Sequence, residues 1–223
     1  MFTFRRFFRP FLALISVLVI AIAQPVTAGD LPTLEQILGR YVEALGGREN
    51  LTKLTTRSII GEQIDDRPYK GERVTIGIEA WADTTGAFSM VMHEAGGDRR
   101  TGSDDDHNAK LAFIFNPQGP LMIAKHFPNP HVTGTWDYDG KLYYKVENDL
   151  KFEYYTLYFE VETGMLTRIG YHWWLEDFRT VDGVLIPFIV VRGRKGGSTT
   201  LYLETVTHNG DVTEHLATGG QER

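Results

Sequence analysis

Cysteine is absent from this sequence of 223 residues. Its absence excludes disulfide bonds, a thiol nucleophile, a thiolate metal site and a lipid anchor on an N-terminal cysteine. The sequence also has no Gly-x-Ser-x-Gly elbow, no phosphate-binding loop and no dinucleotide fingerprint. We therefore expect a domain that is held by its hydrophobic core, and we predict no catalytic residue, no metal site and no cofactor.

A run of apolar residues long enough to span a membrane is also missing. The run Phe11–Ala23 is shorter than the roughly 18 residues that a spanning helix needs. Arg5, Arg6 and Arg9 precede it and the small residue Ala28 follows it, which is typical of a cleaved secretory signal. We predict cleavage after Ala28 and a periplasmic protein; a membrane anchor is the alternative, and the export route, general or twin-arginine, stays open.

Basic residues are scarce in the predicted mature chain. Removal of 28 residues leaves 195, which is the size of one domain, and takes three arginines with it. The remaining 20 Lys and Arg then face 29 Asp and Glu, so the net charge is about −9. Because phosphate contacts need basic patches, nucleic acid is not an expected partner. Arg192, Arg194 and Lys195 are the densest basic group; we predict an exposed hairpin tip, with docking to anionic headgroups or to a protein as the alternative.

What the chain does contain is a long series of strand patterns. The stretch Phe152–Val191 has large apolar side chains at both parities, which predicts a sheet that is covered on both faces. Turn signals such as Asp139-Gly140, Thr163-Gly164 and Asp182-Gly183 recur from residue 85 onward. They predict an antiparallel sheet of roughly nine to eleven strands that curls as its twist accumulates.

Helical spacing is confined to the beginning of the predicted mature chain. Leu34 to Leu45 form one apolar face, with Thr33 and Gln36 as a capping box and Gly46 as the stop. A short second helix is expected within Arg48–Leu54. No later segment has a convincing helical period, and Phe127–Thr135 is expected to be a long loop because of its prolines.

The predicted fold class is therefore α+β and mostly β. We expect a curled antiparallel half-barrel with the N-terminal helix covering its concave face. Residues 29–223 would form this single domain.

Three local patterns resemble the outer-membrane lipoprotein-sorting proteins related to LolA and LolB. They are Ala44-Leu45-Gly46-Gly47, the hairpin Val161-Glu162-Thr163-Gly164-Met165-Leu166, and the strand pair Asp177–Pro187 with the sequence DFRTVDGVLIP. The hairpin departs from the family pattern at Val161, where Asp is common, and residues 83–151 show no resemblance. The resemblance implies an antiparallel half-barrel that encloses an apolar cavity, and in LolA itself this cavity takes the acyl chains of lipoproteins.

Each of these motifs also has an ordinary structural explanation. Gly46 ends a helix, Thr163-Gly164 and Asp182-Gly183 turn hairpins, and Pro187 is expected at a sheet edge or a bulge. The motifs therefore support a fold rather than a binding residue.

Large apolar side chains are the best candidates for a ligand site, because adaptable Met and aromatic residues suit a cavity for acyl chains. A core that is simply filled by the helix is the alternative. The predicted ligand-binding residues are Leu38, Tyr41, Trp81, Phe88, Met90, Met92, Phe113, Phe115, Tyr158, Trp174 and Phe188.

Two partial metal motifs are present. His93-Glu94 begins a zinc-protease signature, but Gly97 stands where the second His is required. Asp104, Asp106 and Asn108 match the first half of a calcium loop, but the Gly and the final Glu are missing. We interpret His93 as a residue of a sheet face or rim and the aspartates as a solvated loop.

Three functional hypotheses follow. The first is a non-enzymatic periplasmic carrier for the acyl chains of a lipid or lipoprotein, with an envelope membrane protein as a further partner. The second is a protein-interaction or envelope-assembly module whose core is filled. The third is a metal-dependent hydrolase that uses His93 or the loop Asp104–Asp106.

Overall fold

The computed structural model describes residues 31–67, 71–102, 106–150, 155–194 and 197–217. Several sequence-based predictions fall outside this part of the chain. These are the signal segment 1–28, Asp104, the side chains of Asp106, Asn108 and Arg194, and Lys195.

The strands form one antiparallel sheet of eleven strands that does not close, in the order β4-β3-β2-β1-β11-β10-β9-β8-β7-β6-β5. The predicted fold class and the predicted number of strands are confirmed. The strands are β1 (Thr56–Arg67), β2 (Glu72–Asp83), β3 (Phe88–Glu94), β4 (Gly97–Gly102), β5 (His131–Tyr138), β6 (Lys141–Glu147), β7 (Leu157–Glu160), β8 (Leu166–Ile169), β9 (Trp173–Val181), β10 (Val184–Arg194) and β11 (Gly197–His208).

The sheet consists of two meanders that join where the first strand of the chain pairs with the last. β1 lies beside β11, with Ile59 opposite Val206, so the edges of the sheet are β4 and β5. The chain crosses between these edges through α3 (Asp106–Phe115), η2 (Gly119–Met122) and α4 (Ile123–His126). This crossing places a second group of helices against the sheet.

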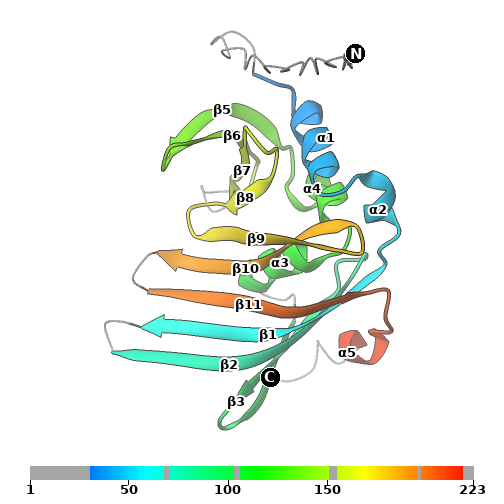
Figure 1. Cartoon of the computed structure of the whole chain (residues 1–223), viewed down its shortest axis with the longest axis vertical. Coiled ribbons are helices and arrows are strands. Elements are labelled where there is room, and N and C mark those ends of the chain that lie inside the picture. The colour runs from blue at the N-terminus through cyan, green and yellow to red at the C-terminus, as the bar shows by residue number, and fades with distance from the viewer. Residues whose placement is uncertain (1–30, 68–70, 103–105, 151–154, 195–196, 218–223) are drawn as a thin grey trace, which may run out of the picture. The chain divides into compact units, whose positions relative to one another are not determined.

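The main core lies between the helices and one face of the sheet. α1 (Leu34–Ala44) buries Ile37, Tyr41 and Val42, and α2 (Arg48–Thr52) buries Leu51. Figure 1 shows α1, α2 and α4 grouped together and α5 (Thr213–Ala217) apart from them. The capping box of Thr33 and Gln36 is present, as predicted.

α3 was not predicted. Its residues Leu111–Phe115 are buried at five consecutive positions. The polar residues of α3 come before this run along the chain rather than on one face of the helix, so the periodicity that reveals a surface helix is missing.

The predicted loop Phe127–Thr135 is also wrong in part, because β5 begins at His131. The prolines end before this point, at Pro130, and Gly134 sits at an irregularity of the β5–β6 ladder. An edge strand tolerates such a bulge, which is why a proline- and glycine-rich segment still forms a strand here.

The three motifs meet around the N-terminal helices. A Cβ atom on Gly46 would lie 2.1 Å from the carbonyl oxygen of Gly183, and the amide of Leu185 donates a 2.9 Å hydrogen bond to the Leu45 carbonyl. Gly164 packs against Arg40, whose guanidinium donates to the carbonyl of Glu162 at 2.8 Å. The motif residues therefore dock α1 onto two hairpins of the sheet.

The opposite face of the sheet is covered at one end. Trp81 and Val91 form a small separate cluster with Val212, next to α5. The Trp81 ring stacks on His215 at 4.0 Å between ring centroids. In the part of the chain that the structure describes, no helix has the length and apolar character needed to cross a membrane.

Candidate functional site

The predicted ligand-binding residues fall into three places. Trp81 lies in the cluster next to α5, while Tyr158 and Trp174 lie near Arg168 on the sheet face away from α1. The other eight belong to the main core or pack against it: Leu38, Tyr41, Phe88, Met90, Met92, Phe113, Phe115 and Phe188.

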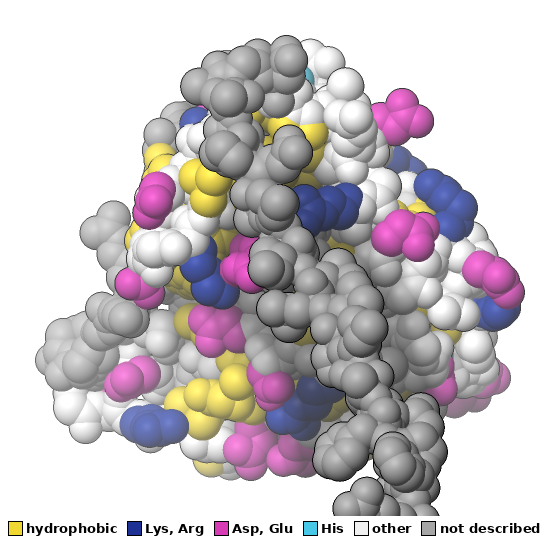
Figure 2. Space-filling view, turned by 45° about the horizontal axis from the view of Figure 1, so that its top comes forward, with side chains coloured by type: hydrophobic (Ala, Val, Ile, Leu, Met, Phe, Trp, Pro, Cys, Tyr) yellow, Lys and Arg dark blue, Asp and Glu magenta, His cyan; other side chains and the backbone are white. Residues whose placement is uncertain are grey.

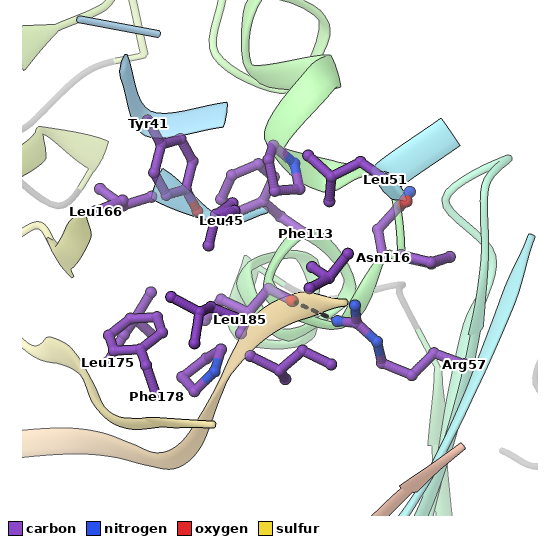
Figure 3. A pocket seen from close by; sticks show the side chains of 16 residues that line it. Tyr41, Leu45, Leu51, Arg57, Phe113, Asn116, Leu166, Leu175, Phe178 and Leu185 are labelled. Atoms are coloured by element: carbon purple, nitrogen blue, oxygen red, sulfur yellow. Dashed lines mark hydrogen bonds between the residues drawn. The ribbon is translucent and has the colours of Figure 1, made fainter. Parts of the chain in front are cut away.

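The space under the helices is small. A cavity of about 30 Å³ lies between α1, α2, α3 and the β9–β10 hairpin, and Tyr41 and Phe113 are the two predicted residues that line it (Figure 3). This volume suits about one water molecule. Elsewhere the rings pack on each other, as Phe88 does on Phe115 with centroids 6.1 Å apart. In this conformation the cavity of about 30 Å³ is too small for an acyl chain.

Arg57 is the charged residue of this small cavity. It is 4% exposed, and it reaches from β1 to donate a 3.4 Å hydrogen bond from Nη1 to the carbonyl of Ile114 on α3 (Figure 3). Its Nε donates to Nε2 of His208 at 3.0 Å, and Nδ1 of His208 lies 2.9 Å from a carboxylate oxygen of Asp182. Burial lowers the pKa of Arg57 to about 10. A connected polar chain thus links the β9–β10 turn, two strands and α3.

The protonation state of His208 follows from this geometry. Because Nε of Arg57 is a donor, Nε2 of His208 must accept, so the proton is on Nδ1 and the ring is neutral. Burial, and after it the charge of Arg57, lower the pKa of His208 against the opposing effect of Asp182.

We expect His208 to make folding pH-dependent. Its folded pKa is below the unfolded value of about 6.5, so its contribution is present above pH 6.5 and is lost as the pH falls through the folded pKa. The slope for one group is at most about 1.4 kcal/mol per pH unit. Melting curves of the wild type and of His208→Gln between pH 8 and 5 test this. The wild type should melt at a higher temperature than His208→Gln at pH 8, and this difference should shrink as the pH falls. A difference in melting temperature that stays constant would contradict the lowered pKa of His208.

A much larger space lies on the other face of the sheet. It is a cleft of about 930 Å³, within the range of about 300–1,000 Å³ that is usual for small-molecule sites. We call it the β8–β10 cleft. Its lining includes Tyr138, Asp139, Lys141, Tyr143, Glu160, Thr163, Met165, Thr167, Arg168, Tyr171, Trp174, Leu175, Glu176, Asp177, Phe178, Leu185, Val191, Gly193 and Ser198.

The cleft and the small cavity share a wall. Leu175, Phe178 and Leu185 line both spaces, so the cleft borders the helix-covered core. The β9–β10 ladder is irregular here: Pro187 pairs with Phe178, the next position is unpaired, and Asp177 has a φ of 51°. Pro187 is in an interior strand rather than at a sheet edge, and it lies beside this irregularity, as the bulge alternative predicted.

The cleft was largely missed by the sequence-based prediction of ligand-binding residues. Of the predicted residues only Trp174 lines it, whereas Tyr138, Tyr143 and Tyr171 were missed. A usable signal existed: Tyr138 and Tyr143 flank the Asp139-Gly140 turn, and Arg168 is the one charged residue of the short strand Leu166–Ile169. A lone arginine inside a buried strand is unusual enough to suggest a role.

Of the two partial metal motifs, only the one at His93 lies within the described residues. His93 lies on β3 with an exposed side chain, between Asp98 at 2.9 Å and Glu79 at 3.3 Å, and the hydrogen bond to Asp98 raises its pKa most. Nowhere among the described residues do three His, Asp or Glu side chains come together as a metal site. His126 and His131 flank the proline-rich segment, and His131 bonds the carbonyl of Asn129 at 2.9 Å.

Charged side chains of both signs are mixed on the surface. On the face drawn in Figure 2, outside the grey atoms, Lys and Arg are interspersed with Asp and Glu rather than gathered in one patch. This face offers no basic stripe of the kind that tracks a nucleic-acid backbone.

The sequence matches no protein-family model and no curated protein. Among solved structures, a LolA superfamily protein from Nitrosomonas europaea has a TM-score of 0.53 and 10% identity, covering 83% of this chain and 98% of that one. A DUF1329 family protein from Desulfovibrio piger has a TM-score of 0.47 and 10% identity, covering 79% and 93%. An outer membrane lipoprotein-sorting domain from Vibrio parahaemolyticus has a TM-score of 0.47 and 8% identity, covering 77% and 93%. The first similarity shows that this chain has a LolA-like fold.

Proposed function

We propose that this protein is a periplasmic binding or carrier protein for the acyl chains of a lipid or lipoprotein, and that it releases them without chemistry. The observation that supports this most is the β8–β10 cleft, because it combines ligand-sized volume with aromatic and aliphatic walls. The LolA-like fold is a second support. Residues 29–223 would be the binding domain, and an envelope membrane protein would deliver or receive the ligand.

In this proposal the acyl chain lies along Met165, Leu175 and Val191. Each methylene that leaves water contributes about 0.8 kcal/mol, so about ten of them contribute roughly 8 kcal/mol before the costs of association. Leu175, Phe178 and Leu185 separate the chain from the helix-covered core. Movement of α1 would open that core and lengthen the site.

The second candidate is a protein-interaction module with a filled core. The cavity of about 30 Å³ under the helices favours it, since that space takes no ligand in this conformation. In this case the cleft would hold a side chain of a partner rather than a lipid.

The experiment is native mass spectrometry with solvent extraction on the full chain, expressed in a Gram-negative host and purified without detergent. We expect about one co-purified lipid per protein. Trp174→Asp should lower lipid occupancy at least about tenfold, because a charge in the cleft wall disfavours an acyl chain.

Tyr202→Asp is the matched control. Tyr202 is exposed, it pairs with Ile189 two residues before Val191 in β10, and so it shares the sheet face of the cleft without lining it. The Tyr202→Asp variant should keep the lipid occupancy of the wild type. An apo mass for the wild type, together with no uptake of a fluorescent fatty-acid probe, would sink the carrier proposal and favour the interaction module.

A further inference from the structure

Arg168 is a buried cation in the wall of the β8–β10 cleft. It lies on β8 and is 6% exposed, although arginine is almost never fully buried unless it is paired. In the register of the sheet Arg168 is opposite Trp174, and Tyr158 is opposite Arg168. The residue therefore projects from the same sheet face as the aromatic side chains of the cleft.

Two of its nitrogens are fixed by the turn that follows. Nε donates to the carbonyl of Gly170 at 2.9 Å, and Nη2 donates to the carbonyl of Tyr171 at 3.1 Å. Nη1 is buried and has no hydrogen-bond partner among the described residues. A buried donor without a partner is rare and calls for an explanation such as a bound group.

Five aromatic rings surround the guanidinium. Its central carbon lies 4.7 Å from the ring centroid of Trp136, 4.9 Å from those of Tyr138 and Trp174, 5.6 Å from that of Tyr158 and 5.8 Å from that of Tyr171. Such contacts stabilise a cation without neutralising it. The rings also hold the side chain in one orientation before any ligand arrives.

No acidic side chain among the described residues forms an ion pair with Arg168. Two carboxylates that line the cleft have other cations: Glu160 is 2.7 Å from Nζ of Lys141, and Asp177 accepts from Arg179 at 3.0 Å. The other two, Asp139 and Glu176, disfavour an anion elsewhere in the cleft. An anionic group would therefore bind at Arg168 by direct contact with Nη1.

We infer that Arg168 is an anion-binding subsite, which takes the carboxylate or phosphate head of an amphiphile whose apolar chain lies in the cleft. This inference rests on the proposed function and adds the charge of the ligand to it. One oxygen of the head group accepts from Nη1, and the rings exclude water from this bond. A charge-assisted hydrogen bond in such surroundings is stronger than a neutral one.

The test is isothermal titration calorimetry of the full chain with four probes: dodecanoate, dodecyl phosphate, dodecanol and inorganic phosphate. We expect both charged amphiphiles to bind on the order of ten- to a hundredfold more tightly than dodecanol. Inorganic phosphate alone should bind far more weakly than dodecyl phosphate.

Variants separate the role of the charge from a structural role. Arg168→Gln should remove the preference for charged heads and leave the affinity for dodecanol unchanged. Arg168→Lys, which keeps the charge but loses the fork, should retain part of the preference, and it serves as the readout where the Gln variant does not fold. Arg99→Gln, on the edge strand β4 and more than half exposed, does not line the cleft and is the matched control with no change expected.

Three other results of these titrations would each refute a different part of the proposal. Equal binding of dodecanoate and dodecanol, unaffected by Arg168→Gln, would refute the subsite and leave the carrier function intact. Inorganic phosphate that binds as tightly as dodecyl phosphate would mean a site for free anions rather than for lipid heads. No binding of any amphiphile would refute the carrier function itself.

Discussion

Replacing Gly46 by alanine is expected to destabilise the protein by at least about 3 kcal/mol, and for a domain of this size to lower its melting temperature by roughly 6–12 °C. The new Cβ atom would lie 2.1 Å from the carbonyl oxygen of Gly183, a separation that real Cβ atoms do not show. Gly46 also has a φ of 114°, which L side chains rarely adopt. Thermal denaturation followed by circular dichroism measures the change.

The expected destabilisation is large because neither Gly46 nor Gly183 can move freely to relieve the clash. The carbonyl of Leu45 accepts from the amide of Leu185 at 2.9 Å, and the side chain of Asn50 donates to the Gly46 carbonyl at 2.8 Å. Gly183 itself has a φ of 79° and packs against Asn50. Relief of the clash therefore breaks the hydrogen bond that docks the end of α1 on the β9–β10 turn.

Gly39→Ala provides a matched control on the same helix. Gly39 is inside α1, and a Cβ atom added there meets no other atom within 4 Å. Because alanine favours a helix over glycine by about 1 kcal/mol, this variant should be slightly more stable than the wild type. Two substitutions of the same chemistry should thus shift the melting temperature in opposite directions. Equal stabilities for Gly46→Ala and the wild type would mean that α1 is not docked in solution.

This contact also explains how much of the fold could be predicted. Turns and helix ends depend on local chemistry, so Thr33 as a cap, Gly46 as a stop and Asp182-Gly183 as a turn were readable from the sequence. Their second roles are not local. Gly46 and Gly183 are 137 positions apart, and only the folded chain shows that each must be small because of the other.

The location of the cleft could not be predicted, for a related reason. The ligand-binding residues were predicted from residue type, as large apolar side chains. Residue type does not show on which face of a sheet a side chain lies. Met90 and Met92 alternate with Val91, and the structure places the methionines in the main core and Val91 next to α5. The apolar pattern thus identified the core that the helices cover, whereas the cleft is recognised by Arg168 and its tyrosines.

The second large effect is expected for Arg57→Met, which we predict to destabilise the protein by about 3 kcal/mol. Removal of one member of a buried polar chain leaves its partners unsatisfied: the carbonyl of Ile114 and Nε2 of His208 both lose their donor. Methionine fills most of the volume of the arginine side chain, so a cavity contributes little. Urea denaturation, with the slope of the transition held constant, measures the loss.

The same variant has a spectroscopic signature. The charge of Arg57 is one of the causes that lower the pKa of His208, so its removal should raise that pKa. Proton NMR titration of the His208 ring detects this shift directly. His93 on β3 is the internal reference, because Arg57 is not among the groups that shift its pKa and its titration should stay unchanged in the variant.

Two further variants test whether Arg57 stabilises the protein through its buried polar partners. Arg179→Met removes an arginine that is 55% exposed at its side chain and paired with Asp177, so it should cost at most about 1 kcal/mol. Arg57→Met combined with His208→Leu removes both partners, and the double variant should lose less stability than the sum of the single changes. Strict additivity would show that Arg57 and His208 act independently, and the link between β11 and α3 through the Arg57 side chain would then be wrong.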